Sequence, residues 1–388
     1  MRIFRFPPPG LGAALLFPLA MAMAGGTGPA RAHPRFAADM GRSCAQCHVD
    51  VQGGGLRNSF GVQQYSRTIL PAITAGDLGY DDFDTEIHER IRLGADTRVQ
   101  FYDYDDGGEA ENAFFPMQAD VYFGVRPADH LLFYYEQNIL ETVAATAVWA
   151  QISDGDGEDY LRVGRFRQTY GLRIDDHTAY IRGGNVGGLM IGRSTAGIDP
   201  VLQGLHWKPR NYTAGVEARY ALMDMAVTGS VGKRPADDEY SYAADLSMPY
   251  SLGPLKGFGG VSWFRGSYYG RIDPYSYYGI YTGVSVGPMV FLAELDAAED
   301  YAAEDARSMA AYGEVTWSVR EWIHLRGEYH LFDADTGSQD DRLDMYAAGI
   351  ELFPVPFVEI EPLFRYVEAE ADPDFSRSEF ILQVHFWL

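Results

Sequence analysis

The sequence predicts an all-β fold, an antiparallel β-barrel of about 16 strands that follows a short N-terminal segment. Three observations predict it. From residue 90 onward, apolar and polar residues alternate with a period of two over runs of about ten residues. The connections between these runs are alternately short and long. No apolar run after residue 32 approaches the roughly 20 residues that a membrane-spanning helix needs.

The first predicted strand, residues 90–103, shows the alternation. Leu93 and Val99 point to one face, and Arg92 and Arg98 point to the other. The same design recurs in residues 115–125, 212–222, 309–319, 321–332 and 345–353. A strand of this kind has one apolar face to cover, either with lipid or with a protein core.

The connections differ in length at the two ends of the predicted strands. The short turns fall at residues 126–129, 221–224, 318–322 and 353–357. The long loops are acidic and fall at residues 103–112, 153–159, 294–307, 333–341 and 368–374. Short turns at one end and long loops at the other are typical of an outer-membrane barrel, whose outer face touches lipid and whose closure pairs every backbone group. The alternative is a soluble β-sandwich, whose half-buried strands also alternate.

Strand number follows from length. Residues 86–388 provide about 16 strands at roughly 19 residues per strand with its share of loop, and the number should be even. Eighteen strands are the alternative, because residues 183–209 show no clear pattern. The last strand is expected at the C-terminus, where Phe380, Val384 and Leu388 share one face.

The N-terminus has the features of a secretory signal peptide. Arg2 and Arg5 precede an apolar stretch at residues 11–24, and a small-x-small pattern follows at residues 30–32. The stretch is too short for a spanning helix. We therefore predict a signal peptide at residues 1–32 and a location in the outer membrane of a Gram-negative bacterium.

Both cysteines of the 388-residue chain lie in one short motif. Cys44 and Cys47 are three positions apart and His48 follows directly, which is the attachment pattern of c-type haem. In that chemistry each thiol adds to a haem vinyl group and the histidine binds the iron. A single disulfide is one alternative, and a zinc site is another, although zinc needs further N or S ligands. We predict one covalent haem c, with Cys44 and Cys47 as thioether anchors and His48 as the proximal ligand, and no catalytic residue.

The sixth iron ligand is open. A methionine raises the haem reduction potential, whereas a second histidine generally lowers it. The main candidates are His33, Met40 and His177, of which His177 lies in the triplet Asp175-Asp176-His177. Other histidines of the predicted barrel are His88, His130 and His206.

The segment that carries the motif, residues 33–85, is thin for a haem domain that folds alone, because small domains bury little surface. We expect it to fold as a plug held in or against the lumen of the barrel, residues 86–388. Inward-facing arginines would then screen the haem propionates or select anions; they are Arg90, Arg92, Arg98, Arg162, Arg165 and Arg167.

The formal net charge of −23 has two interpretations. An acidic rim of loops could concentrate ferrous ions or dock basic electron carriers. Alternatively, the loops are ordinary acidic surface that divalent cations bridge to lipopolysaccharide. The charge disfavours nucleic acid as a partner.

The N-terminal pattern resembles a known family. Its residues are Phe36-Ala37, Gly41, Cys44, Cys47-His48, Leu56, Asn58 and Phe60-Gly61, with a barrel following to the C-terminus. The pattern is similar to that of the fused outer-membrane monohaem cytochrome–porins of iron-oxidising bacteria. The chain departs from it at residues 53–55, which are three glycines, and at Arg57. A weaker resemblance, in residues 164–166 and 170–171, is to the phosphate-type porins, which are trimers of 16-stranded barrels.

The cytochrome–porin resemblance implies electron transfer across the outer membrane through one haem, from extracellular ferrous iron to a periplasmic electron carrier. The residues themselves leave the direction of flow open, so the extracellular partner is an electron donor or an acceptor. It implies an electron-transfer protein rather than a conventional enzyme, in the sense of an iron:cytochrome oxidoreductase. The alternative is a solute porin with an N-terminal plug that bears a haem or is closed by a disulfide. Outer-membrane lipid and, from the weaker resemblance, two further copies in a homo-trimer are the other expected partners.

Overall fold

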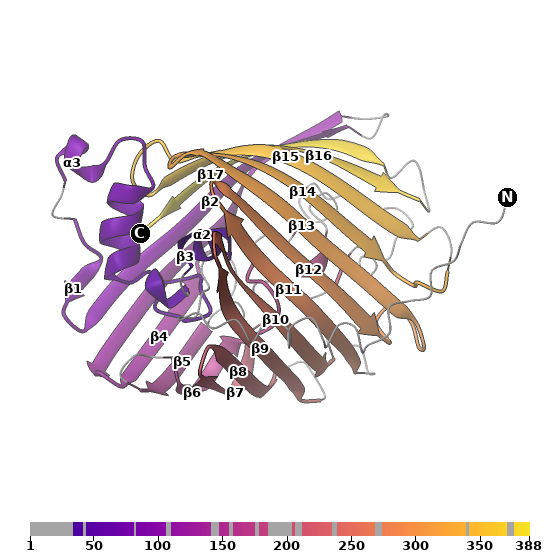
Figure 1. The fold of residues 1–388 in the computed structure, drawn as a ribbon, viewed down its shortest axis with the longest axis horizontal. Helices are drawn as coiled ribbons and strands as arrows, with labels where there is room; N and C mark the ends of the chain where they lie inside the picture. The colour runs from indigo at the N-terminus through magenta and orange to yellow at the C-terminus, as the bar shows by residue number, and fades with distance from the viewer. Residues whose placement is uncertain are drawn as a thin grey trace.

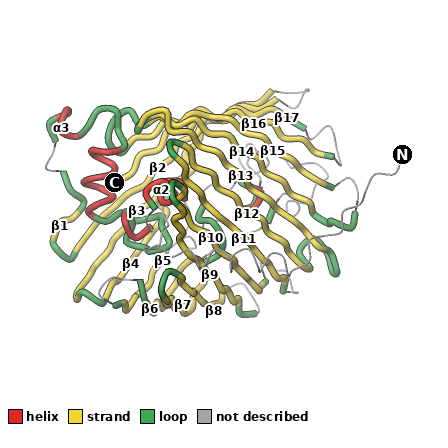
Figure 2. Tube along the Cα trace, viewed as in Figure 1, coloured by secondary structure: helices red, strands yellow, loops and turns green. Residues whose placement is uncertain are grey.

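The computed structural model describes residues 34–41, 44–80, 83–105, 110–140, 147–154, 158–174, 178–184, 204–205, 212–234, 239–267, 274–338, 341–370 and 376–388. They form a closed antiparallel β-barrel of 16 strands (Figures 1 and 2). The predicted signal peptide lies outside the described residues. None of the helices in the described part of the chain is long and apolar enough to cross a membrane.

Every strand of the barrel pairs with its neighbours in sequence, and β17 pairs with β2 to close the cylinder. The strands are β2 (Ile91–Asp105), β3 (Ala110–Ala128), β4 (Leu131–Asn138), β5 (Ala147–Ser153), β6 (Tyr160–Arg167), β7 (Tyr212–Leu222), β8 (Met225–Lys233), β9 (Ser241–Leu252), β10 (Leu255–Gly266), β11 (Tyr275–Val286), β12 (Met289–Glu299), β13 (Arg307–Arg320), β14 (Ile323–Asp333), β15 (Arg342–Leu352), β16 (Val358–Ala369) and β17 (Arg377–Trp387).

The strand count of 16 is confirmed. The short strand β1 (Glu86–His88) only extends the sheet at the start of β2. Strand β6 pairs directly with β7 along its whole length, from Tyr160–Arg219 to Arg167–Tyr212. Two further strands between them, as an 18-stranded barrel would need, have no place in the wall.

The period-two alternation puts apolar side chains outside and polar side chains inside. On β12, Phe291 and Leu295 are 41% and 46% exposed on the outer face, whereas Glu294 and Asp296 are buried in the interior. Strand β2 follows the prediction in the same way, with Leu93 outside and Asp96 inside. Lipid covers an outer face of this kind, so the arrangement is that of a membrane barrel.

Two tight turns that the sequence analysis did not identify join β9 to β10 and β11 to β12. Each has two residues between the strands, and its first residue is a glycine, Gly253 or Gly287, with a φ of +62° or +57°. A glycine at the first position is favoured in such hairpins because it adopts positive φ without strain. These turns lie at the same end of the barrel as the predicted short turns.

The N-terminal segment, residues 34–80, enters the lumen from the end with the short turns. Its elements are α2 (Pro34–Met40), the 3₁₀ turn η1 (Cys44–Gln46), the π-helix η2 (Phe60–Ile69) and α3 (Ala75–Leu78). Figure 1 shows α2 within the barrel outline and α3 beyond its mouth. Ala72 and Ile73 donate backbone hydrogen bonds of 2.9 and 3.1 Å to the turn at Phe353 and Pro354.

A second segment folds inward from the wall between β6 and β7. Arg182 is the last residue of the 3₁₀ turn η4 (Tyr180–Arg182). Its buried guanidinium lies 2.9 Å from the carboxylate of Glu294 on β12. Tyr170 donates a 2.9 Å hydrogen bond to Asp296 of the same strand. Residues 168–174 and 178–184 therefore cover the inner faces of strands across the lumen. The predicted triplet Asp175-Asp176-His177 lies between them, outside the described residues.

Candidate functional site

The Cys-x-x-Cys-His motif forms one tight turn. The backbone nitrogens of Cys47 and His48 donate to the carbonyl oxygen of Cys44, at 3.0 and 2.9 Å. In a 3₁₀ turn the side chains at positions i and i+3 eclipse each other. Cys44 and Cys47 therefore lie on the same side of the turn, and both are buried. We call residues 44–48 the Cys–His turn.

A short antiparallel ladder fastens the Cys–His turn to the chain that follows it. Val49 donates to the carbonyl of Leu56, and Asn58 donates to the carbonyl of Cys47, both at 2.9 Å. His48 and Arg57 form the pair between these bonds. The loop that joins the two sides of this ladder can reverse direction because Gly53, Gly54 and Gly55 all have positive φ, between +62° and +87°. The three glycines, which depart from the pattern of the resembled family, thus have a local structural reason.

Helix η2 begins against the back of the turn. Asn58 accepts a 3.0 Å hydrogen bond from the Gly61 nitrogen through its side-chain oxygen and donates a 2.7 Å bond to the Ala45 carbonyl. A Cβ atom at Gly61 would overlap the carbonyl oxygen of Cys47. The Asn-x-Phe-Gly part of the motif therefore holds the helix in close contact with the turn.

On one side of the lumen, the loop after the turn is anchored to β6 and β7. Asp50 lies 2.9 Å from the buried guanidinium of Arg162 on β6. Burial raises the pKa of the Asp50 carboxyl, but Arg162 and Arg173 outweigh that effect and hold the pKa below its ordinary value. Gln52 donates to the buried carboxylate of Glu217 on β7 at 2.7 Å.

On the other sides, the segment is anchored to β15 and to the strands where the barrel closes. Arg35 of α2 forms an ion pair with Glu351 of β15, and both side chains are 1% exposed. Leu56 is fully buried against β2 and β3, where Gly94 and Gly124 leave room for its two methyl groups. The Cys–His turn thus lies inside the lumen, in a segment attached to strands around the barrel.

The donor set of the Cys–His turn fits a covalent haem c. Two thiols lie on one side of a single turn, and an imidazole follows in the next residue. Burial raises the pKa of the Cys47 thiol to about 11, against the opposing effect of Arg57. A buried thiol with a raised pKa is a poor nucleophile at neutral pH, which disfavours thiol exchange at Cys47.

The candidates for the sixth iron ligand lie in different parts of the chain. His33, His177 and His206 lie outside the described residues. Met40 is the half-buried last residue of α2, close in sequence to the turn. His88 and His130 are exposed at the short-turn end, in β1 and in the turn between β3 and β4. We find no contact between either of these and the Cys–His turn in the described residues.

Three inward-facing histidines were not predicted from the sequence, and all are buried: His324, His330 and His385. The period-two phase could have found them, because each alternates with an outward apolar neighbour. His385 lies between two carboxylates: its Nε2 is 2.7 Å from Asp96 and its Nδ1 is 2.9 Å from Glu359. Its ring is 5.0 Å from that of Trp387, whose indole donates to Ser66 of η2 at 2.9 Å.

The inward-facing arginines were predicted in part. Arg162 is buried against Asp50, and Arg98 lies 3.9 Å from Asp96 on the inner face of β2. Arg90 instead lies at the rim, where its 44% exposed side chain donates to the backbone carbonyls of Arg126 and Pro127 near the end of β3. Arg162 and Arg98 thus have carboxylate partners, so the lumen around them is ion-paired rather than purely cationic.

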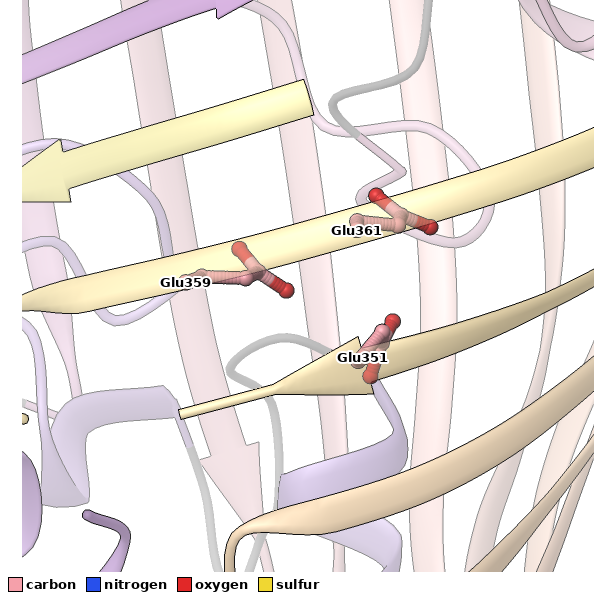
Figure 3. A group of neighbouring side chains, drawn as sticks. All are labelled: Glu351, Glu359 and Glu361. Atoms are coloured by element: carbon pink, nitrogen blue, oxygen red, sulfur yellow. The ribbon is translucent and has the colours of Figure 1, made fainter. Parts of the chain in front are cut away.

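A cluster of three glutamates lies on β15 and β16. Ligand oxygens of Glu351, Glu359 and Glu361 lie within 4.8 Å of one another, and Figure 3 shows the side chains together. Each carboxylate already has a cationic or imidazole partner: Arg35 and Arg326 bind Glu351, Arg326 binds Glu361, and His385 binds Glu359. The cluster is therefore compensated by protein charges.

No protein-family model matches the chain, and no curated protein matches it. Solved structures share its fold. The anion-selective porin from Comamonas acidovorans is 10% identical, with a TM-score of 0.54 over 77% of this chain and 99% of that one. The trimer form of OmpT from Vibrio cholerae is 13% identical, with a TM-score of 0.53 over 77% and 99%. OmpF of Salmonella typhi, in complex with daunomycin, is 9% identical, with a TM-score of 0.52 over 77% and 97%.

These likenesses define the fold. The chain is a 16-stranded barrel of the outer-membrane porin type, and the predicted outer-membrane location agrees with that fold and with the apolar outer face. The predicted similarity to porins is confirmed at this level. The resemblance to cytochrome–porins stays a prediction.

Proposed function

We propose that the protein carries electrons across the outer membrane through one covalent haem c, bound at Cys44, Cys47 and His48. The observation that carries the proposal is the position of the Cys–His turn inside the barrel lumen. A redox group attached there is enclosed by a closed wall, as an electron conduit through a membrane requires. The porin fold alone does not explain why the chain uses its only cysteines at this place.

The chain's residues have distinct parts in this function. Cys44 and Cys47 would hold the haem through thioether bonds, and His48 would bind its iron. The bound haem would supply reversible one-electron exchange between ferric and ferrous iron. Arg35 and Asp50 fix the segment to the wall through their ion pairs, which keeps the site at one depth in the lumen.

The partners follow from the two ends of the barrel. We propose an extracellular one-electron donor, ferrous iron, at the end with the long acidic loops, where negative charge raises the local concentration of cations. A periplasmic electron carrier would accept the electron at the short-turn end, where η2 and α3 lie (Figure 1).

Redox-titrated absorption spectroscopy tests the proposal. The full chain is produced with a c-type cytochrome maturation system, purified and titrated, with ferrous iron as one reductant. We expect a c-type band in the wild type that ferrous iron reduces. The band should disappear in the Cys44→Ala/Cys47→Ala variant and persist in His130→Ala, a matched control at an exposed histidine. A wild-type protein without a c-type band would overturn the proposal.

The second candidate is a solute porin whose lumen the N-terminal segment narrows. The fold similarity to porins, including one named as anion-selective, favours it. Single-channel recording of the haem-loaded full chain separates the two candidates. A large, ion-selective conductance with no reduction by ferrous iron supports the porin.

We also propose that the barrel is a homo-trimer. Strands β4, β5 and β6 have 8, 7 and 8 residues, whereas a tilted strand needs about 9–11 to cross a bilayer. Their outer face carries an apolar groove of about 350 Å³ lined by residues such as Phe133, Val148 and Val163. In a trimer, neighbouring copies would cover the outer face of these short strands and shield it from lipid.

A further inference from the structure

Arg57 lies on the same face of the chain as the proposed iron ligand. His48 and Arg57 form a pair of opposite residues in the antiparallel ladder, and the hydrogen bonds on either side of the pair come from their neighbours. Opposite residues in such a ladder have Cβ atoms about 4.5–5.5 Å apart, and a pair not hydrogen-bonded to each other is at the close end of that range. The side chains of His48 and Arg57 therefore leave the ladder from neighbouring positions on one face.

The surroundings of Arg57 leave part of its hydrogen-bonding capacity unused. Its nearest carboxylate, Asp96, is 3.8 Å from Nη1, beyond hydrogen-bond range, and that Nη1 is buried without an acceptor among the described residues. Asp96 itself accepts from His385 at 2.7 Å. On another side the guanidinium lies 5.3 Å from the ring of Trp387. An arginine held in this way is arranged to bind an anionic group from a ligand.

We propose that Arg57 is a positioning residue of the site, which binds a haem propionate and stabilises the reduced haem by its charge. The inference rests on the proposed function and deepens it. It also gives a role to one of the two departures of the sequence from the family it resembles.

The sign of the effect follows from charge. The reduced haem carries one more electron than the oxidised haem, so a nearby positive charge favours the reduced form and raises the midpoint potential. Asp96, on the other side of the guanidinium, acts in the opposite direction. Removing the two charges one at a time should therefore move the potential in opposite directions, which loss of packing alone would not do.

The test is a redox titration of the haem-loaded full chain and its variants, followed at the c-type band. Arg57→Gln should lower the ratio of reduced to oxidised haem at a fixed potential about tenfold, a shift of about 59 mV for one electron. Asp96→Asn should raise the ratio, and Arg57→Lys should stay closer to the wild type than Arg57→Gln. Arg320→Gln, at an exposed arginine at the end of β13, is the matched control and should leave the midpoint unchanged.

The outcomes are distinct. A wild-type midpoint in Arg57→Gln, or a shift in the same direction as in Asp96→Asn, overturns the inference and leaves the proposed function intact. A wild type without a c-type band overturns both. If Arg57→Gln fails to retain haem, Arg57→Lys decides: recovered haem supports the inference, and a haem-free Arg57→Lys overturns it.

Discussion

Glycines set the shape of the Cys–His turn and of the segments that pack against it. Three consecutive glycines with positive φ return the chain so that His48 meets Arg57. Gly61 allows η2 to touch the Cys47 carbonyl, and Gly94 and Gly124 provide space for Leu56. At Gly61, Gly94 and Gly124 the absence of a Cβ atom is essential, because backbone or a buried side chain occupies the space that it would take.

Gly61→Ala should therefore loosen the Cys–His turn. The new Cβ would overlap a backbone oxygen that no rotamer change can move, and overpacking of this kind costs about 1–3 kcal/mol. Limited proteolysis followed by mass spectrometry should show faster cleavage within residues 44–61 of the purified barrel. Gly229→Ala is the control, because a Cβ there meets no atom within 4 Å. Equal cleavage in both variants would contradict the packing argument.

At the scale of elements, α2 is a seven-residue helix that its contacts with the barrel stabilise. A helix this short is marginal by itself, since helix nucleation is unfavourable. Its buried Arg35 forms an ion pair with Glu351. Burial lowers the pKa of the Arg35 guanidinium, but Glu351, Glu314 and Glu359 together outweigh that effect and raise the pKa above its ordinary value. Arg35 also lies 4.4 Å from the ring of Phe36. The ion pair thus fixes where the helix lies against the wall.

Arg35→Ala should release α2 from the wall. Removing one partner of a buried ion pair costs about 3–5 kcal/mol, and we expect the lower end because Glu351 keeps Arg326 at 2.9 Å. The amides of residues 35–40 should then exchange hydrogen about 100-fold faster, measured by mass spectrometry in detergent. The exposed Arg320→Ala should leave this exchange rate unchanged. Unaltered exchange in Arg35→Ala would show that the pair does not hold the helix.

For the whole molecule, the decisive feature is that the described lumen is occupied. The N-terminal segment reaches the inner faces of β6, β7 and β15, and residues 168–184 cover part of β12 in their described portions. Many inward carboxylates are buried as a result, with Glu217 and Asp296 both at 0% exposure. The barrel has the wall of a porin and an interior packed with ion pairs.

Deleting residues 34–80 should open the barrel to ions. The deletion removes the side chains that fill the lumen at the short-turn end, so single-channel conductance in planar bilayers should rise severalfold. A heat-sensitive electrophoretic shift of the variant would show that the barrel has still formed. A folded deletion variant with the conductance of the full chain would contradict this account of the N-terminal segment.

A charge on the outer face of the short strands β4, β5 and β6 should dissociate the proposed trimer. Val148→Glu places a carboxylate at a side chain that is 50% exposed on the outer face of β5, where a neighbouring copy would bury it. Val227→Glu, at a side chain of similar exposure on β8, is the control and should leave the trimer intact. Native mass spectrometry in detergent gives the oligomeric state. A monomeric wild type would contradict the proposal.

The sequence by itself determined the barrel class, a strand number of about 16 and the Cys–His turn, because these depend on local patterns, whereas 18 strands were excluded only by the direct pairing of β6 with β7. The phase of residues such as Leu93 and Asp96 sets which face of a strand meets lipid, and a Cys-x-x-Cys-His run is one turn long. Only the tertiary structure decided where the turn lies and what surrounds it. His385 meets Asp96 because β17 closes on β2, and Arg57 approaches the same Asp96 because the N-terminal segment lies in the lumen. Both are long-range contacts that no local pattern encodes.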